Sequence, residues 1–519
     1  MKQKRDRYEM HKYWGKKPSN DLKELIEKFS SEKDIVLDPF SGYGVFCCEA
    51  YILNRNVISN DLNPIANFIN KQLLNKSIDI DLVKKQWELI KTEFKPFNNK
   101  WFLWEYSNRK IELISILRNN NDIPLRAKFK EKGKSKYIEI PLAKESVNEY
   151  IKKETNYTIE DWYPNEELIP NSRISAKLGM KVSDLFTKRT LACHAKLLSL
   201  IEKYSSGNEL DLFKLAFTSN LANCSRLVPP IRSRGEMSQG AWMTGFYTGE
   251  TYIENNVFHY FENRLNKAIK GKLDYLQQFN KGILDFNIKE YDNWYKVLQN
   301  DVKQLEIKDE SIDYIFTDPP YGDAVPYFEQ SIIWNSWLKF APDYKQEIVI
   351  TDSKVRNKNI SVFEEEINIA FSEIRRVLKS GKFFSLTYHS LSGIEWKSIT
   401  NACIKNGFDL YSFDWLVQKS FTPRQINRLK SVKGDVLVTL IKSDLPEYTS
   451  QRTDEDIKQL FISKITEWLT NNPLDTNEIF LKIMKMIFSE KILIGNIDLL
   501  KVLTENFDFT DTQKWRIYG

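Results

Sequence analysis

The stretch from Ile35 to Gly44 reads IVLDPFSGYG, and a segment of helix-forming residues follows it from Val45 to Leu53. The apolar run at its start predicts a short buried strand, and the glycines predict a tight turn before a helix. Gly42 and Gly44 would let the backbone approach a ligand closely at the helix start, where N–H groups point outward. The stretch therefore predicts a strand, turn and helix of an α/β fold, with a ligand beside the turn.

An acidic residue follows the next apolar stretch, which runs from Asn56 to Ser59. Asp61 comes about twenty residues after the glycine turn, and from this position a carboxylate can bind the two hydroxyls of a ribose. Asn63 and Pro64 come next, and this pair is equally typical of an ordinary helix start. We therefore predict that Asp61 binds the ribose of a cofactor.

A further apolar run, Ile312 to Phe316, leads into the tetrapeptide Asp-Pro-Pro-Tyr at residues 318–321. This pattern suits methylation of an exocyclic amino group, whose lone pair is delocalised into its ring. Asp318 would accept one N–H of that group and the carbonyl of Pro319 the other, while the two prolines stiffen the loop. Tyr321 would stack on a base that has left its duplex. The alternative interpretation is a plain turn after a buried strand.

Together these pieces resemble the S-adenosylmethionine-dependent DNA amino-methyltransferases, which act on adenine N6 or cytosine N4. The segment from His11 to Pro18 resembles the one that precedes the glycine turn in this family and lines the methionine end of the cofactor. Asn300 and Asp301 resemble the motif whose acidic residue meets the cofactor adenine. The stretch from Asp318 to Leu338 resembles one subgroup of adenine-specific DNA methylases.

The resemblance implies a set of site residues. The cofactor would be S-adenosylmethionine, and its expected ligands are Tyr13, Trp14, Lys17, Pro18, Asp38, Pro39, Phe40, Ser41, Gly42, Gly44, Asp61, Asn63 and Asp301. The expected catalytic residues are Asp318, Pro319, Pro320 and Tyr321. The implied substrate is double-stranded DNA with a flipped base. We favour adenine as the target base, because aspartate at the first position of the tetrapeptide is more typical of the adenine enzymes in the resembled family. The implied setting is restriction-modification or phage defence, beside a cognate nuclease or other subunits.

The alternation of strands and helices predicts a Rossmann-like, doubly wound α/β sheet interrupted by a large inserted domain. The methyltransferase domain is expected in two parts, residues 1–75 and 291–444. Residues 76–290 are too many for a connecting loop, and we expect them to form an inserted domain. The resemblance implies that this domain recognises the DNA target. Residues 445–519 carry apolar residues at helical spacing and are expected to form a helical C-terminal region.

Basic residues gather in three places. The predicted DNA-binding residues are Lys128, Lys130, Lys132, Lys134, Arg226, Arg232, Arg234, Arg424 and Arg428. The first four alternate with smaller or apolar residues, which predicts a hairpin with one cationic face. Such a face would contact phosphate, or it would be a solvated edge that discourages aggregation. The arginines of residues 223–235 would either hydrogen-bond guanine edges or bind phosphate. Those near residue 424 would contact the DNA backbone or solvent.

Composition bears on the number of domains, the kind of partner, metal binding and the cellular location. The chain has 519 residues and a net charge of +6, which suits several domains and is compatible with nucleic-acid binding. The five cysteines contain no C-x2-C pair, so we predict no metal site, although a zinc ribbon often interrupts the catalytic domain of the resembled subgroup. No apolar segment follows Met1 to Arg5 or approaches membrane-spanning length, so we expect a cytoplasmic protein.

Two other functions share part of the pattern. Transfer-RNA guanine-N2 methyltransferases also resemble the Asp-Pro-Pro-Tyr-Gly stretch, but they carry an RNA-binding domain before the glycine turn, for which this sequence leaves little room. A catalytically silent DNA-recognition subunit of a defence complex is the other alternative. The presence of Asp38, Asp61 and Asp318 argues against it, because a silent protein has no chemical need of all three.

Overall fold

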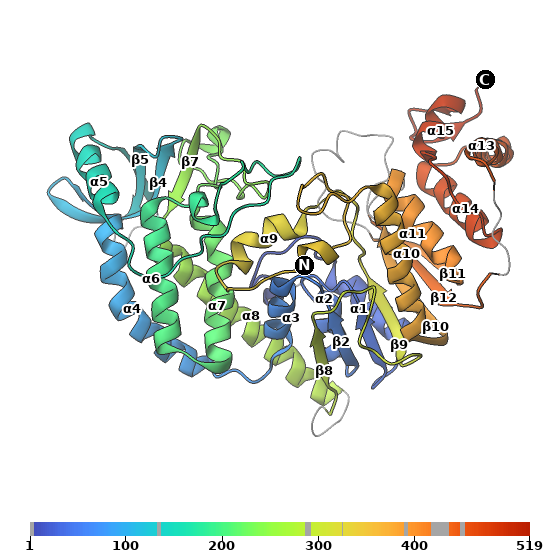
Figure 1. The fold of residues 1–519 in the computed structure, drawn as a ribbon, viewed down its shortest axis with the longest axis horizontal. Helices are drawn as coiled ribbons and strands as arrows, with labels where there is room; N and C mark the ends of the chain where they lie inside the picture. The colour runs from blue at the N-terminus through green and yellow to red at the C-terminus, as the bar shows by residue number, and fades with distance from the viewer. Residues whose placement is uncertain are drawn as a thin grey trace. The chain divides into compact units, whose positions relative to one another are not determined.

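The computed structural model describes residues 5–131, 136–285, 292–323, 325–388, 393–416, 435–446 and 452–518. The chain forms two compact units, each assembled from separate segments (Figure 1). Unit 1 comprises residues 1–14, 63–289 and 326–344, and unit 2 comprises residues 15–62, 290–325 and 345–519. Each unit has a sheet of its own, so the chain holds more than one core.

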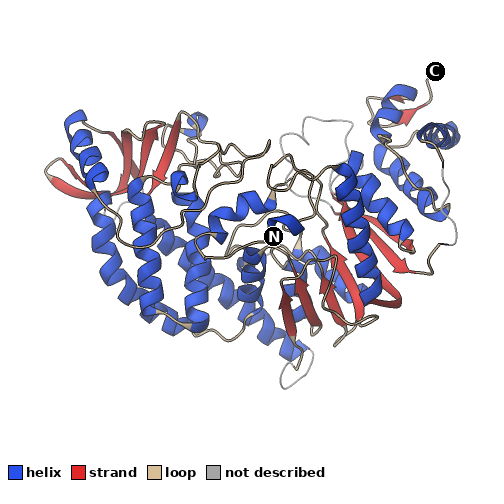
Figure 2. Ribbon diagram, viewed as in Figure 1, coloured by secondary structure: helices blue, strands red, loops and turns tan. Residues whose placement is uncertain are grey.

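Unit 2 is built on a seven-stranded sheet with the strand order β11-β12-β10-β9-β1-β2-β8. Its strands are β1 (Ile35–Asp38), β2 (Asn56–Asn60), β8 (Tyr295–Leu298), β9 (Ile312–Thr317), β10 (Leu378–Tyr388), β11 (Phe408–Leu416) and β12 (Asp435–Lys442). Strands are drawn red in Figure 2. Neighbouring strands are parallel from β8 to β10, and β12 runs antiparallel to both β10 and β11. The strands predicted from the apolar runs at 35–37, 56–59 and 312–316 are confirmed.

The order of the parallel strands reverses at β1. The chain passes from β1 outward to β2 and β8, and then returns to place β9 on the other side of β1. Leu37 is fully buried between its two neighbours, since it pairs with Ile58 of β2 and with Ile315 of β9. In open parallel sheets, ligands bind outside the carboxyl ends of the strands at such a switch point. The residues that follow β1, β2 and β9 therefore occupy the place where a ligand is expected.

Helices pack against this sheet and extend its core. They are α1 (Ser19–Phe29), α2 (Val45–Ile52), α10 (Ile360–Val377), α11 (Gly393–Lys405), α13 (Asp454–Asn471), α14 (Thr476–Ser489) and α15 (Leu499–Asn506), with the small strands β13 (Asp508–Phe509) and β14 (Trp515–Arg516) after them. The C-terminal helices share the hydrophobic core of the sheet. Phe480 packs against Phe413 of β11, and the Trp396 indole donates to the sulfur of Met484 at 3.1 Å. The C-terminal region is thus helical, as expected, and is part of unit 2.

Unit 1 contains most of the expected insertion. Its helices are α3 (Pro64–Leu74), α4 (Ile80–Phe102), α5 (Lys144–Asn156), α6 (Lys188–Tyr204), α7 (Gly207–Leu221), α8 (Val257–Asp285) and α9 (Tyr327–Asn335). Its antiparallel strands are β3 (Leu103–Tyr106), β4 (Arg109–Asn119), β5 (Pro124–Lys130), β6 (Tyr137–Pro141) and β7 (Thr251–Asn255). Contacts also assign residues 1–14, 63–75 and 326–344 to this unit. Among the described residues, no helix is both long and apolar enough to cross a membrane.

A buried ionic network joins the strands and helices of unit 1. The side chain of Arg118 on β4 is fully buried, and it contacts Glu254 of β7 at 3.0 Å and Glu154 of α5 at 2.9 Å. Arg189 of α6 also contacts Glu254, at 2.9 Å. Burial alone lowers the pKa of Arg118, but the two carboxylates outweigh this effect and raise that pKa, so the guanidinium stays charged. The network holds four elements together at one point.

Candidate active site

Three carboxylates stand at the carboxyl ends of neighbouring strands in unit 2. Asp38 ends β1, Asp61 follows β2 and Asp318 follows β9. Asp38 is only 4% exposed, and this burial raises the pKa of its carboxyl well above the usual range. The nearby charges of Asp318 and Asp61 raise this pKa further, while hydrogen bonds from Phe40 and Thr317 lower it. The structure therefore brings together acids that the sequence predicted for the cofactor and for the substrate.

The glycine turn between β1 and α2 is held by backbone groups. Gly42 and Gly44 have φ values of 49° and 84°, a region that side chains disfavour. The N–H of Gly42 donates to Oδ2 of Asp61 at 2.9 Å, and the N–H of Ser41 donates to the carbonyl of Asn60 at 2.9 Å. The carboxylate predicted to bind a ribose is thus oriented by the turn itself.

Asn60 is a site residue that the sequence analysis missed. Its Nδ2 donates to the carbonyls of Pro39 and Asn300, both at 3.1 Å, and its Oδ1 accepts the N–H of Asn300 at 2.9 Å. One fully buried amide therefore ties the ends of β1, β2 and β8. The signal that could have identified it is an amide residue directly before Asp61, at the end of a buried strand.

The donors and acceptors around the turn fit S-adenosylmethionine. Oγ of Ser41 is buried, and no hydrogen-bond partner is found for it within the described ranges. Buried hydroxyls are normally hydrogen-bonded, so a bound polar group would satisfy it. Asp61 offers a carboxylate for the ribose hydroxyls, and the nearby acids favour a cationic ligand such as a sulfonium.

Two other predicted cofactor residues also lie in unit 2. Asp301 follows β8, and its Oδ1 accepts the N–H of Lys303 at 3.0 Å, while its Oδ2 lies 3.4 Å from Nζ of the same lysine. This carboxylate is thus fixed beside its own turn. Pro18 is the N-cap of α1, where its φ of −64° suits the helix start.

Lys17 contacts two residues of the Asp-Pro-Pro-Tyr tetrapeptide. Its Nζ is 3.0 Å from Oδ2 of Asp318 and 3.3 Å from the hydroxyl of Tyr321. The other carboxylate oxygen, Oδ1, accepts a hydrogen bond from the hydroxyl of Thr387 at the end of β10. The resemblance implied a cofactor ligand at Lys17, and the structure gives this lysine two partners among the predicted catalytic residues.

The remaining predicted cofactor residues, Tyr13, Trp14 and Asn63, belong to unit 1. The ring of Tyr13 lies roughly parallel to that of Tyr327, with centroids 6.4 Å apart, and Trp14 packs against the buried Trp334 with centroids 5.1 Å apart. Asn63 comes before α3, and its side chain does not cap the helix. Its amide donates to Ser331 at 2.9 Å and accepts from Asn335 at 3.0 Å, so it serves packing within unit 1.

The basic face of β5 is partly neutralised. Lys128 lies 3.3 Å from Glu139 of β6 and also donates to the carbonyl of Met237 at 2.8 Å. Lys130 is exposed, and its Nζ lies 5.8 Å from the ring centroid of Tyr137. The paired strands of the expected hairpin are confirmed. Lys132 and Lys134 lie outside the described residues.

The predicted arginines differ in their surroundings. Arg226 forms an ion pair with Asp122 and donates to the carbonyl of Asp184 at 3.3 Å, so it is bound within unit 1. Arg232 and Arg234 lie in a short 3-10 helix and are exposed. Arg424 and Arg428 lie outside the residues that the structure describes. DNA contact remains a prediction for all of them.

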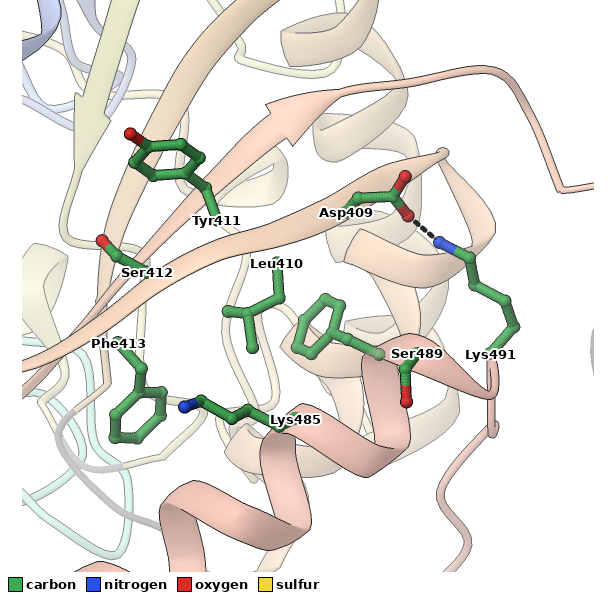
Figure 3. A pocket seen from close by; sticks show the side chains of 9 residues that line it. Asp409, Leu410, Tyr411, Ser412, Phe413, Lys485, Ser489 and Lys491 are labelled. Carbon is green, nitrogen blue, oxygen red and sulfur yellow. Dashed lines mark hydrogen bonds and ion pairs between the residues drawn. The ribbon is translucent and has the colours of Figure 1, made fainter.

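A hollow of about 490 Å³ lies elsewhere in unit 2, between β11 and α14 (Figure 3). Its lining residues are Asp409, Leu410, Tyr411, Ser412, Phe413, Lys485, Phe488, Ser489 and Lys491. Lys491 forms an ion pair with Asp409 across it. None of the predicted site residues lines this hollow, so it does not define the candidate active site.

Comparison with known proteins supports a methyltransferase. A DNA methylase family model matches residues 1–72, which include the glycine turn and Asp61. No curated protein matches the chain. Geranyl diphosphate C-methyltransferase from Streptomyces coelicolor A3(2), in complex with Mg²⁺, geranyl diphosphate and S-adenosyl-L-homocysteine, is a similar solved structure, with 10% identity and a TM-score of 0.16. A second is geranyl diphosphate methyltransferase in complex with GPP and sinefungin, at 10% identity and a TM-score of 0.17.

Both structural matches are partial. Each covers 33% of this chain, and they cover 61% and 60% of the solved chains. With such low TM-scores, the likeness carries no argument about this protein's site. The family match to residues 1–72 supports methyl transfer, and it falls on the segment that holds the glycine turn and Asp61.

Proposed function

We propose that the chain is an S-adenosylmethionine-dependent DNA methyltransferase that acts on the exocyclic amino group of a flipped base, with adenine N6 preferred. One observation carries the proposal: Asp61 and Asp318 each lie within electrostatic reach of Asp38, at the carboxyl ends of β1, β2 and β9. A methyl donor at the turn and an amino group at Asp318 would then share one site. The DNA methylase match supports the same reaction class.

The residues of the site have separate tasks in this proposal. S-adenosylmethionine supplies a methyl group activated by a positively charged sulfur. Asp61 binds the ribose hydroxyls, and the turn at residues 41–44 lets the backbone approach the cofactor. Asp318 and the Pro319 carbonyl accept the two N–H bonds of the amino group, which directs its lone pair toward the methyl carbon. Tyr321 stacks on the base, and positioning supplies most of the rate.

The fold supports this assignment. We infer that the seven-stranded sheet is the Rossmann-like, doubly wound sheet of a methyltransferase, because its parallel order reverses at β1 and an antiparallel β12 lies near its end. Residues 76–290 form the inserted target-recognition domain in this proposal. Their own sheet and helices support a folded domain, and the exposed Arg232 and Arg234 offer phosphate or guanine contacts. A role in restriction-modification or phage defence, beside a nuclease, belongs to the same proposal.

The first test expresses the full chain in a host that lacks DNA methylation and maps modified bases across its genome by single-molecule sequencing. We expect N6-methyladenine at one recurrent sequence, and no modification with an Asp318→Ala control. N4-methylcytosine would change only the base, because a carboxylate accepts an N–H from either amino group. An unmodified genome, with the chain folded and bound to S-adenosylmethionine, would contradict autonomous DNA methylation and favour an RNA substrate or a missing partner.

Asp61→Ala should weaken S-adenosylmethionine binding by at least about tenfold, because hydrogen bonds to a charged group contribute about 1.5–3 kcal/mol each. The variant also loses the acceptor for Gly42 N–H, which loosens the turn. Isothermal titration of the purified chain with S-adenosylmethionine measures the change. Asp511→Ala, at an exposed position of the same unit, is the matched control and should bind as the wild type does. Equal affinity for both variants would exclude Asp61 as a cofactor ligand.

A further inference from the structure

The ion pair between Lys17 and Asp318 is shielded from solvent. The two side chains are 8% and 17% exposed, and their charged atoms lie 3.0 Å apart. Pairs with this little exposure are screened less by water and salt than ordinary surface pairs. The same ammonium also donates to the Tyr321 hydroxyl at 3.3 Å, so one side chain connects the first and last residues of the tetrapeptide.

The carboxylate of Asp318 is oriented from its other side as well. Thr387 is fully buried on β10, and its hydroxyl donates to Oδ1, while Lys17 contacts Oδ2. β10 is the parallel neighbour of β9, and Leu386 pairs with Thr317 directly before Asp318. These two contacts orient the plane of the carboxylate, with a donor on each oxygen. A carboxylate oxygen can accept more than one hydrogen bond.

The chain before Lys17 also lies against this carboxylate. Gly15 has a φ of +69°, and a Cβ atom added there would stand 3.4 Å from Oδ2 of Asp318. A side chain at this position would be strained by this φ, and its Cβ would contact the carboxylate. The backbone at Gly15 thus lies close to Asp318, in addition to the side chain of Lys17.

We propose that Lys17 is a positioning residue for methyl transfer, which holds Asp318 and Tyr321 ready for the target base, and is not a ligand of the cofactor. This inference rests on the proposed function. Lys17 and Thr387 both donate to the Asp318 carboxylate, so the carboxylate is held as a hydrogen-bond acceptor, which is what the target amino group requires. Its bond to the hydroxyl fixes the ring on which the base would stack.

The test compares Lys17→Met with the wild type as purified full chains. Methionine keeps the length of the side chain and removes its charge. We expect kcat for methyl transfer to unmethylated genomic DNA to fall about 10- to 100-fold, as for a lost positioning contact, while the Kd for S-adenosylmethionine, measured without DNA, changes less than about twofold. Lys17→Arg, which retains the charge, should recover part of the loss. Lys23→Met, on the exposed face of α1, is the matched control.

Two further readouts separate this role from a structural one. In an Asp318→Ala background, Lys17→Met should lower the residual rate little further, because its partner is already absent. Thermal melting of each variant identifies any that is unfolded. If the wild type is active and the Lys17→Met variant keeps its kcat, the inference about Lys17 is overturned and the proposed function stands. The same holds if the variant loses at least tenfold in cofactor affinity at unchanged kcat. A folded wild type that binds S-adenosylmethionine but methylates no nucleic acid overturns the proposed function, and the inference with it.

Discussion

Replacing Asp318 with alanine should lower kcat for methyl transfer by on the order of 10²- to 10³-fold, the loss typical of removing one transition-state hydrogen-bonding group. The amino group would lose the acceptor that holds one of its N–H bonds, and Lys17 and Thr387 would lose the carboxylate between them. Cofactor affinity should stay close to that of the wild type. Single-turnover methyl transfer with saturating S-adenosylmethionine measures the chemical step directly.

Asp318→Asn refines this experiment. The asparagine amide keeps one acceptor oxygen but lacks the charge that pairs with Lys17. The kcat of Asp318→Asn should therefore lie between that of the wild type and that of Asp318→Ala. Asp309→Ala is the matched control, since Asp309 is 73% exposed in the loop before β9 and pairs with Arg376. If Asp318→Ala kept kcat within threefold of the wild type, the tetrapeptide would not be the catalytic element.

Arg118→Met should destabilise unit 1 by about 3 kcal/mol, at the low end of the cost of breaking a buried ion pair. The substitution leaves the fully buried Glu254 with one guanidinium, that of Arg189, in place of two. It also leaves Glu154 without its 2.9 Å contact. Urea unfolding followed by fluorescence and circular dichroism gives the loss as a lower midpoint.

The control for this variant lies on the same strand. Arg109 is exposed at the start of β4, and its replacement by methionine should change the free energy of unfolding by less than about 0.5 kcal/mol. Glu254→Gln should destabilise at least as strongly as Arg118→Met, because it leaves two buried guanidinium groups facing a neutral amide. Equal stability of Arg118→Met and Arg109→Met would show that the network contributes nothing net.

The strands of the central sheet were predictable because burial on both faces leaves continuous apolar runs. Ile312 to Phe316 is apolar except for Asp313, and the structure shows the whole segment buried in β9. The strand β11 was not predicted. Its sequence FDLYSFDWL mixes acidic and aromatic residues. The strand lies at the edge of the sheet and has a neighbouring strand on one side only, so its residues need not form an apolar run.

The candidate site was predictable in part for a similar reason. Asp38, Asp61 and Asp318 each follow a strand directly, and parallel strands place their carboxyl ends together. The partners of Asn60 and Lys17 were not predictable. Asn60 contacts Asn300, and Lys17 contacts Asp318 across 301 positions of sequence, and one chain without its relatives carries no local signal for such pairs.

The placement of β8 beside β2 has a consequence for biosynthesis. Val57 pairs with Tyr295, so the ribosome must translate more than 230 intervening residues before β2 acquires its outer neighbour. β9, which covers the other side of β1, is translated later still. Until then β1 and β2 present two open edges, which are prone to mispairing with other nascent chains. Folding of the intervening residues before β8 emerges would shorten the effective separation of β2 and β8, and so the time for which these edges stay open.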